Sequence, residues 1–331
     1  MSSAPTIARS RVSLTVVILA RNEERHLARA LASIAPLAMR TIVVDSGSAD
    51  RTVEIARAQG AEVVERAWLN YADQFQWVLD NCGIDTDWTM RLDADEWLGE
   101  DLVATLSGLL PGLDPATTAI SLDRQHHFMG RWIRHGGRWP LRLLRIWRTG
   151  LGNIEQRWMD EHIVVEQGEI LHVPGTFVDQ NEHGLGYFTD KHNGYATREA
   201  LDALIGKYGL FEACDGAALA STAQARRARA HKTGWYNRLP TGIGPLLYFL
   251  YRYICQLGFL DGKAGLIYHV LQGFWYRFLV DAKRVELEAA MADAGGMDAK
   301  IDALSAATGH DLRAFSRGAG LGRPGNTIPE A

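Results

Sequence analysis

The sequence predicts an α/β fold with a doubly wound, mostly parallel sheet and a C-terminal helical extension. Short apolar runs rich in β-branched residues alternate with segments of helical spacing along the first part of the chain, which is typical of such a sheet. The chain has 331 residues, enough for one large domain with an extension or for two domains. Its hydrophobic content of 47% and charged content of 22% are ordinary for a globular protein.

These patterns predict the strands and helices in order. The first strand is expected over residues 14–20, because so apolar a run suits a strand buried on both faces. Apolar residues at helical spacing then predict a helix that ends before Pro36. The elements expected after it are a strand over 41–44, a helix from Asp50 to Gly60, a strand over 61–64, a helix over 71–81, a strand that ends at Asp93, a helix over 101–110, a strand over 119–122 and a helix that begins at Lys191.

The acidic stretch that follows the strand beginning at Trp88 is the main candidate for a functional site. In an open α/β sheet, ligands bind at the carboxyl ends of the strands. Asp93 and Asp95 stand two positions apart, so we expect both side chains to point the same way and to face one cation. Their hard oxygen ligands suit Mg²⁺ or Mn²⁺ better than Zn²⁺. A solvated acidic turn is the alternative that this motif alone leaves open.

The loop after the first strand excludes two kinds of nucleotide site. It reads Ala20-Arg21-Asn22-Glu23, so it lacks the G-x-G-x-x-G of a dinucleotide-binding domain, and the chain contains no Walker motif. Acidic side chains bind a diphosphate only through a cation. A nucleotide together with a divalent metal ion is therefore the simplest ligand for this edge of the sheet.

Two later stretches add polar candidates. Residues 125–148 are dense in Arg, His and Trp, which suit sugar rings and phosphates if they are exposed; packing of the Trp side chains on the sheet is the alternative. Asp160 and Glu161 interrupt an apolar stretch, where a carboxylate tends to have a raised pKa and can act as a base. A solvated acidic turn explains that pair equally well.

Three motifs, in their order and spacing, resemble those of glycosyltransferase family 2: residues 44–50, 92–96 and 160–162. Residues 20–23 and 88–96 are more closely similar to the branch that includes lipopolysaccharide-core β-glucosyltransferases. The resemblance covers roughly residues 12–200. It implies a GT-A fold, a nucleoside-diphosphate sugar donor, with a UDP-hexose expected, and inversion at the anomeric carbon.

The resemblance also implies roles for residues on the donor side of the site. Asp45 would contact the uracil or the ribose, and Lys191 would reach the leaving diphosphate. A solvated surface lysine is the alternative for Lys191. The residues that the resemblance places along the nucleotide pocket are Ala20, Arg21, Asn22, Glu23 and Gln74.

The metal ligands and the base follow from the same resemblance. Asp93 and Asp95 would handle the ribose and the metal-bridged diphosphate, with Asp95 the more direct ligand of Mg²⁺ or Mn²⁺. His183 would reach the metal or the diphosphate, unless it is structural. Similar enzymes often carry a His-Glu pair where this chain has Asp-Glu, so we expect Glu161 to be the base, with Asp160 in reserve.

The C-terminal third differs in composition. Residues 216–260 contain six basic residues, many aromatic ones and no acidic one. Its apolar runs do not reach 18 residues without a charge, so we do not expect a membrane-spanning helix. Aromatic belts with basic flanks predict an interfacial anchor on an anionic membrane surface. A buried helical hairpin or an oligomer interface is the alternative.

These observations divide the chain into three parts. Residues 1–200 are expected to form the catalytic domain that binds the nucleotide sugar. Residues 201–286 form the basic and aromatic helical region, for membrane contact or oligomerisation. Residues 287–331, rich in Ala, Gly and Asp, are expected to form a weakly structured tail.

The combined prediction is a metal-dependent glycosyltransferase of cell-envelope glycan biosynthesis, peripheral on the cytoplasmic face of the inner membrane. Its acceptor would be a glycan or glycolipid, either lipid-linked or a lipopolysaccharide core. The separate cysteines Cys82, Cys214 and Cys255 fit a reducing cytoplasm. A net charge of −4 gives no argument for a nucleic-acid partner, and the sequence leaves a homo-oligomer open.

Two other function classes stay in view. A sugar nucleotidyltransferase also uses an α/β nucleotide fold with carboxylate-bound Mg²⁺, but it would usually show a Gly-rich basic loop after the first strand. A non-catalytic sugar- or nucleotide-binding scaffold is the other class. The joint presence of Asp93, Asp95 and Glu161 argues against it.

Overall fold

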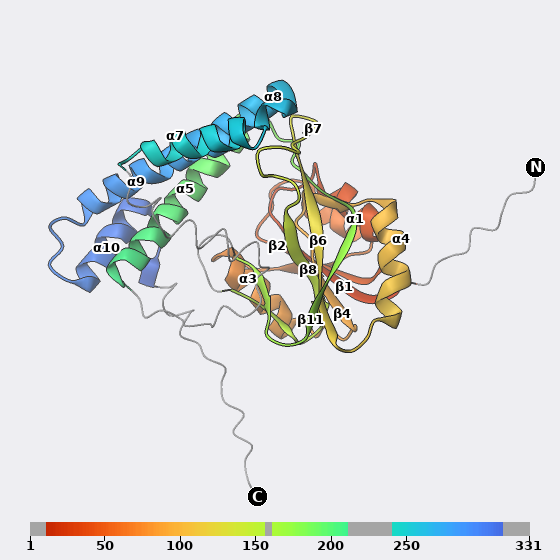
Figure 1. Ribbon diagram of the computed structural model, residues 1–331. Helices are drawn as coiled ribbons and strands as arrows, with labels where there is room; N and C mark the ends of the chain where they lie inside the picture. The colour runs from red at the N-terminus through yellow and green to blue at the C-terminus, as the bar shows by residue number, and fades with distance from the viewer. Residues whose placement is uncertain (1–10, 156–160, 211–239, 314–331) are drawn as a thin grey trace, which may run out of the picture.

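The computed structural model describes residues 11–155, 161–210 and 240–313. A large sheet with its helices forms one part of the molecule, and a layer of C-terminal helices lies beside it (Figure 1).

The strands are β1 Val12–Ala20, β2 Ala38–Asp45, β3 Glu62–Glu65, β4 Trp88–Arg91, β5 Glu96–Leu98, β6 Thr117–Phe128, β7 Arg131–Trp132, β8 Arg142–Arg148, β9 Gly152–Ile154, β10 Ile163–Val165 and β11 Glu169–Gln180. The α-helices are α1 Leu27–Ile34, α2 Thr52–Ala58, α3 Tyr71–Asn81, α4 Glu100–Leu109, α5 Leu185–Tyr208, α7 Ile243–Leu250, α8 Gly262–Tyr268, α9 Tyr276–Ala290 and α10 Met297–Thr308. Shorter helical segments are η1 Leu110–Gly112, η3 Tyr251–Cys255, η4 Gly258–Asp261 and η5 His269–Trp275.

Most strands belong to one sheet, in the order β3-β2-β1-β4-β8-β6-β11-β5, with β7 paired to β6. The strands from β3 to β4 are all parallel. β8 runs antiparallel to both β4 and β6, and β6 pairs in parallel with β11. Consequently β1, β2, β4, β6 and β11 all end at the same edge of the sheet. The predicted α/β class is confirmed, and this edge is where a ligand site is expected.

Each face of the sheet is covered by its own core. On one face, α1, α2 and α4 pack with Leu14, Val16 and Ile18 of β1. On the other face, α3 and the separate β9–β10 sheet pack against Val17 of β1 and Ile42 of β2. β1 therefore supplies alternate residues to two cores, as its continuous apolar run predicts.

The C-terminal helices form two connected groups. α5, α9 and α10 pack together through a core that includes Leu287 and Leu304. Residues 243–275, which we call the hairpin, comprise α7, η3, η4, α8 and η5 and continue into α9. Tyr268 of the hairpin packs on Phe128 at the end of β6. The hairpin thus lies against the same sheet edge at which the polar loops gather, with α8 close to β7 (Figure 1).

Several predicted elements have the expected positions, and the differences have local causes. The helix over 71–81 has the predicted bounds. The strand expected to end at Asp93 ends at Arg91. The differences are at the ends of elements, where a change in backbone direction is not marked by hydrophobic spacing.

The helix predicted to begin at Lys191 begins earlier, at Leu185. Phe188 in its first turn packs edge-on against Phe128, with ring centroids 5.3 Å apart, and this tertiary contact is not visible in local spacing. The helix is continuous across residue 200, where the first domain was expected to end. The described part of the expected tail includes α10.

In the part of the chain that the structure describes, no single helix is both long enough and apolar enough to cross a membrane. The segments Ile243–Cys255 and Gly258–Ala290 have the required length and composition only as a pair. They are bent by 73° at the break between them.

Candidate active site

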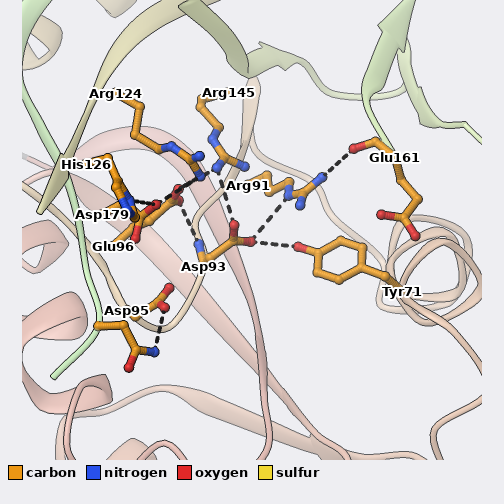
Figure 2. A network of polar contacts seen from close by, with 11 residues as sticks. Tyr71, Arg91, Asp93, Asp95, Glu96, Arg124, His126, Arg145, Glu161 and Asp179 are labelled. Atoms are coloured by element: carbon orange, nitrogen blue, oxygen red, sulfur yellow. Dashed lines mark hydrogen bonds and ion pairs between the residues drawn. The ribbon is translucent and has the colours of Figure 1, made fainter. Parts of the chain in front are cut away.

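The acidic stretch after β4 lies at the sheet edge where β1, β2, β4, β6 and β11 end. β4 stops at Arg91, so Asp93 and Asp95 lie in a turn and not in the strand. Figure 2 shows Asp93 directed at a group of arginines and Asp95 directed at a separate partner. The expectation that both side chains share a direction was therefore wrong, because strand alternation does not extend into the turn.

Asp93 is held as a carboxylate by three neighbours. The Tyr71 hydroxyl donates a 2.8 Å hydrogen bond to Oδ1, and Arg91 and Arg145 form ion pairs at 3.4 and 3.3 Å. Burial would raise the pKa of Asp93, but the two guanidinium groups outweigh burial and hold that pKa well below its usual range. Asp93 is therefore ionised at neutral pH.

Glu96 fixes the position of Asp93 from inside the protein. It is 1% exposed, and its Oε2 accepts a 3.0 Å hydrogen bond from the backbone N–H of Asp93. Oε1 contacts Arg145 at 2.5 Å and Arg124 at 3.3 Å. Burial raises the pKa of Glu96 to about 7, although Arg145 and Arg124 oppose that change. A buried ion pair of this kind sets geometry more than it adds stability.

β6 and β11 contribute another carboxylate to the network. Asp179 contacts His126 at 3.0 Å and Arg124 at 3.4 Å. Burial lowers the pKa of His126, so this imidazole is neutral and its Nδ1–H donates to Asp179. Burial would raise the pKa of Asp179, but Arg124 and His126 hold it well below its usual range. Arg124 thereby joins Asp179 to Glu96 and the strands to the acidic turn (Figure 2).

Asp95 points away from the arginines, towards the start of α5. The side-chain amide of Asn181 donates a 3.0 Å hydrogen bond to its Oδ2. Burial and the negative charge of Asp179 raise the pKa of Asp95, while Lys191 opposes them. Burial would lower the pKa of Lys191, but Tyr195 and Asp95 raise it above its usual value. A cation bound at Asp95 would relieve the repulsion between the carboxylates.

A cluster of possible metal ligands lies at the junction of α1 and α5. The ligand atoms of Glu23, His26 and His183 lie within 4.8 Å of one another. Nε2 of His26 accepts a 2.9 Å hydrogen bond from the backbone N–H of Glu182, so Nδ1 carries the proton and donates to Glu23 at 2.7 Å. Both nitrogens of His26 are thus occupied. Nε2 of His183, in contrast, is buried without a hydrogen-bond partner and is free to bind a ligand.

Asp95 and His183, two of the predicted metal ligands, have a common neighbour in Asn181. Asn181 links them, because its amide group donates to Asp95 and accepts a 3.0 Å hydrogen bond from the backbone N–H of His183. Carboxylate oxygens suit Mg²⁺ and Mn²⁺, and an imidazole is the less usual part of such a set. Asp93 is already engaged by its arginines, so Asp95 fits the role of direct ligand better.

A cavity of about 160 Å³ opens on the other side of Asp93. Asp93 and Glu161 both line it. Arg91 lies between them: it pairs with the Asp93 carboxylate and donates a 3.1 Å hydrogen bond to the backbone oxygen of Glu161 (Figure 2). The expected base is thus at the same cavity as the acidic turn. Asp160, its reserve, lies outside the described residues.

The loop over 20–23 is held by the loop that follows β2. The backbone N–H of Asn22 donates to Ser48 Oγ at 2.9 Å, and that of Glu23 donates to Thr52 Oγ1 at 2.7 Å. Asn22 adopts a left-handed conformation with φ 56°, which asparagine tolerates better than most residues. This loop is therefore ordered before any ligand binds. Its Ala20 is buried at the end of β1 and its Arg21 is exposed.

Asp45 and Gln74 contact the loop that follows β2 and have several partners inside the protein. Asp45 is 3% exposed, and its Oδ2 accepts hydrogen bonds from the backbone N–H groups of Gly47 and Ser48 at 3.0 and 2.9 Å. Gln74 is fully buried, and its Nε2 donates to the backbone oxygen of Arg66 at 3.0 Å. Both side chains shape the loop, and their contact with a nucleotide stays a prediction.

Sequence reasoning missed the residues that hold the acidic turn in place. The only signal was composition, a segment dense in arginine opposite an acidic motif. Trp147 of that segment is fully buried, so for this residue the packing alternative is correct. The missed residues are Tyr71, Arg91, Arg124, His126, Arg145, Asp179 and Asn181.

Residues 15–168 match the model of the family described as Glycosyl transferase family 2. The matched region is slightly less than half of the 331 residues. It includes Asp45, Asp93, Asp95 and Glu161. The match ends before β11 and α5, which supply Asp179 and Lys191.

Two curated relatives are glycosyltransferases by name. An uncharacterized glycosyltransferase of Rickettsia typhi is 38% identical over 89 residues, which are 27% of this chain and 30% of the relative. The 4,4'-diaponeurosporenoate glycosyltransferase of Staphylococcus haemolyticus is 47% identical over 60 residues, 18% of this chain and 16% of the relative. The chain thus spans less than a third of the length of either relative.

Among solved structures, the chain is similar to glucosyl-3-phosphoglycerate synthase from Mycobacterium tuberculosis, in complex with Mn²⁺, uridine diphosphate and glucosyl-3-phosphoglycerate. The sequence identity is 18% and the TM-score is 0.35. The alignment covers 57% of this chain and 81% of that chain.

Proposed function

We propose that the protein is an inverting glycosyltransferase that moves a hexose from a nucleoside diphosphate to a hydroxyl group of a glycan or glycolipid. One observation carries the proposal: Asp93 and Glu161, from distant parts of the chain, line a single cavity and are joined by Arg91. The cavity lies inside the region that matches the glycosyltransferase family 2 model. Two carboxylates at a nucleotide-binding sheet edge suit group transfer better than binding alone.

Glu161 is the proposed base. In an inverting transfer, a carboxylate removes the proton of the acceptor hydroxyl on the face opposite the leaving group. Arg91 fixes the backbone of Glu161 relative to Asp93, so the position of the base is coupled to the donor side of the cavity. Asp160 stays the reserve candidate.

Asp95, His183 and Lys191 form the proposed leaving-group side. A divalent cation bound there would neutralise the charge that develops on the departing diphosphate. Asp95 and His183 supply its ligand atoms. The Lys191 amine lies 5.8 and 5.9 Å from the ring centres of Tyr187 and Tyr195, and it supplies a further positive charge on the same side.

The finer parts of the proposal rest on the family resemblance. It favours uridine as the base of the donor, with the loop over 20–23, Asp45 and Gln74 around the nucleotide. It also favours a lipid-linked or lipopolysaccharide-core acceptor and action at the cytoplasmic face of the inner membrane. Cleavage of the donor therefore releases UDP and leaves the sugar on the acceptor.

Product analysis across sugar nucleotides tests this function. The purified chain is incubated with UDP-, GDP- and dTDP-hexoses, with Mn²⁺ or Mg²⁺ and with a chelator, and the released nucleotide is identified. We expect release of a nucleoside diphosphate that requires the metal. Formation of a nucleoside triphosphate and hexose 1-phosphate when pyrophosphate is added would indicate a nucleotidyltransferase, and absence of turnover with every donor would contradict the proposal. Full activity in chelator would remove the metal from it.

A further inference from the structure

The outer face of the hairpin, residues 243–275, is unusually apolar for an exposed surface. Large apolar side chains at least 37% exposed recur from Ile243 to Leu266, with Ile254 at 55%. A helix on the surface of a water-soluble protein normally exposes its polar face. Contiguous exposed apolar surface of this kind marks a contact with a protein or a membrane.

Two of the three charged residues of the hairpin, Arg252 and Asp261, face inward, and the third, Lys263, is exposed. Within residues 240–262 the charged residues are Arg252 and Asp261, and they are only 5% and 2% exposed. Arg252 Nε donates a 2.6 Å hydrogen bond to the backbone oxygen of Gly136. Asp261 accepts hydrogen bonds of 2.9 and 2.7 Å from the backbone N–H and Nδ1 of His135. Charges therefore attach the hairpin to the sheet domain, and its apolar side chains are left facing outward.

The apex of the hairpin is also apolar. Leu257, Phe259 and Leu260 are 47%, 45% and 49% exposed at the break between the two arms, where soluble proteins usually place polar turn residues. The backbone N–H of Gly136 donates a 2.9 Å hydrogen bond to the backbone oxygen of Gln256 at this break. Irregular backbone is tolerated at membrane depth where the protein itself satisfies its polar groups.

We propose that the hairpin is a membrane-docking element whose apex and outer face insert into one anionic leaflet. The bend of 73° between the arms fits insertion into one leaflet better than crossing of the bilayer. A basic rim favours a membrane over a second copy of the chain. Arg131, Arg134 and Lys263 are exposed beside the apolar face, and Arg131 approaches Gly262. Face-to-face packing of two copies about a two-fold axis would bring these like charges together, whereas anionic headgroups attract them.

Docking would place the catalytic cavity close to the membrane surface. The ring of Tyr268, on the inner side of the hairpin, lies 5.0 Å from the ring of His126, which bonds to Asp179 in the polar network. A lipid-linked acceptor could then enter the cavity while its lipid stays in the leaflet. This consequence, unlike docking itself, rests on the proposed glycosyltransferase function.

Vesicle flotation tests docking. The full chain is mixed with vesicles of phosphatidylcholine alone and of phosphatidylcholine and phosphatidylglycerol in equal parts. We expect it to float with the anionic vesicles, and the double variant Leu257→Asp/Leu260→Asp to float at least about tenfold less. The matched control Leu151→Asp/Val285→Asp changes apolar side chains that are 40% and 56% exposed outside the hairpin, and it should bind like the wild type.

A charge-reversal variant of the basic rim separates the electrostatic contribution to vesicle binding from the contribution of apolar insertion. Arg131→Glu/Lys263→Glu should lose the preference for anionic vesicles. Absence of wild-type flotation on both vesicle types would overturn the proposal. Equal loss in the hairpin and control variants would also overturn it. The proposal would also be overturned if the wild type bound no vesicles and instead formed a stable dimer in sedimentation that only the hairpin variant disrupted.

Cys255, exposed on the hairpin, allows a direct measurement of insertion. It can be labelled with an environment-sensitive fluorophore in a Cys82→Ser/Cys214→Ser background. We expect its emission to shift to the blue with anionic vesicles and to be quenched by lipids labelled in the acyl chain. An unchanged emission on bound protein would contradict insertion of the outer face.

Donor hydrolysis in solution, without vesicles, keeps the two proposals distinguishable. The variant Leu257→Asp/Leu260→Asp should release nucleoside diphosphate at the wild-type rate. If the wild type releases nucleoside diphosphate but never floats, docking is wrong and the proposed function stands. If it floats but processes no donor, the proposed function fails and docking stands.

Discussion

The sheet edge and the hairpin break the usual rule of burial in opposite ways. At the sheet edge charges are buried: Glu96 is 1% exposed and Arg145 is 4% exposed. On the hairpin apolar side chains are exposed, with Ile254 at 55% and Leu260 at 49%. Most proteins bury apolar groups and expose charged ones. The two exceptions indicate the two surfaces at which this molecule meets something other than water.

Different forces therefore hold the two regions. Buried charges are stable only when they are paired, so each carboxylate of the sheet edge fixes the next and the site is rigid before a ligand arrives. The apolar side chains on the outer face of the hairpin form no such pairs, and their exposure is favourable only when a partner covers them. We propose chemistry at the first region and attachment at the second.

The largest expected effect tests whether the buried charges serve chemistry. Glu161→Gln should lower the turnover number by about 10²–10⁴ with little change in donor affinity, because the acceptor hydroxyl loses its base. Steady-state kinetics measures both quantities. Glu166→Gln, at an exposed carboxylate nearby, is the matched control and should leave the rate unchanged. A normal rate for Glu161→Gln would move the role of base to Asp160.

The next prediction tests whether ion pairing offsets the free-energy cost of burying these charges. Arg145→Met leaves Glu96 without its nearest partner and should lower the free energy of unfolding by about 3–5 kcal/mol. Arg142 pairs with Asp123 at 3.4 Å, but its side chain is 43% exposed. Arg142→Met should therefore cost less than about 1 kcal/mol. Urea unfolding of both variants measures the difference, and equal losses would contradict this distinction.

A buried histidine of the hairpin gives a prediction about pH. Burial, followed by Arg252, lowers the pKa of His269 from 6.5 to about 4. Between these two values the unfolded chain binds the proton and the folded chain does not, so stability should fall as the pH drops from 6.5 to 4. The loss from this group approaches about 3 kcal/mol. His269→Leu should flatten the pH dependence of urea unfolding in that window, and an unchanged dependence would exclude His269 as its source.

The smallest effect concerns the contact between the sheet domain and the hairpin at Gly136 and His269. Gly136 has φ 66°, and a Cβ there would lie 2.2 Å from Cε1 of His269. Gly130 has a similar φ of 72°, but its Cβ would meet nothing within 4 Å. Gly130→Ala should cost about 1 kcal/mol through backbone strain, and Gly136→Ala about 2–3 kcal/mol because overpacking adds to that strain. Thermal unfolding compares the two variants. Equal losses of stability would show that the contact between Gly136 and His269 can relax to admit a methyl group.

Hydrophobic spacing predicted the parts of the fold that depend on neighbours in sequence. The β1 strand and the helix over 71–81 follow from local periodicity, and the acidic stretch was located at the correct edge of the sheet. The direction of Asp93 and Asp95 could not be predicted, because nothing in the spacing showed that β4 ends two residues earlier.

The partners of the site could not be predicted because they come from distant segments. Glu96 meets Arg145 only because β8 lies between β4 and β6, and Asp95 meets Asn181 only after β11 has returned to the same edge. Composition did mark the hairpin region as basic and aromatic. It could not show that Arg252 and Asp261 turn inward, which leaves Lys263 as the exposed charged residue of the hairpin.

Metal-assisted glycosyl transfer at the acidic turn is tested most directly by a crystal structure with Mn²⁺ and UDP-hexose bound. Anomalous scattering should locate manganese at ligand distance from the Asp95 carboxylate, with the diphosphate on its other side and the hexose directed into the cavity of Glu161. Manganese and nucleotide bound elsewhere, with Asp95 still bonded only to Asn181, would contradict it.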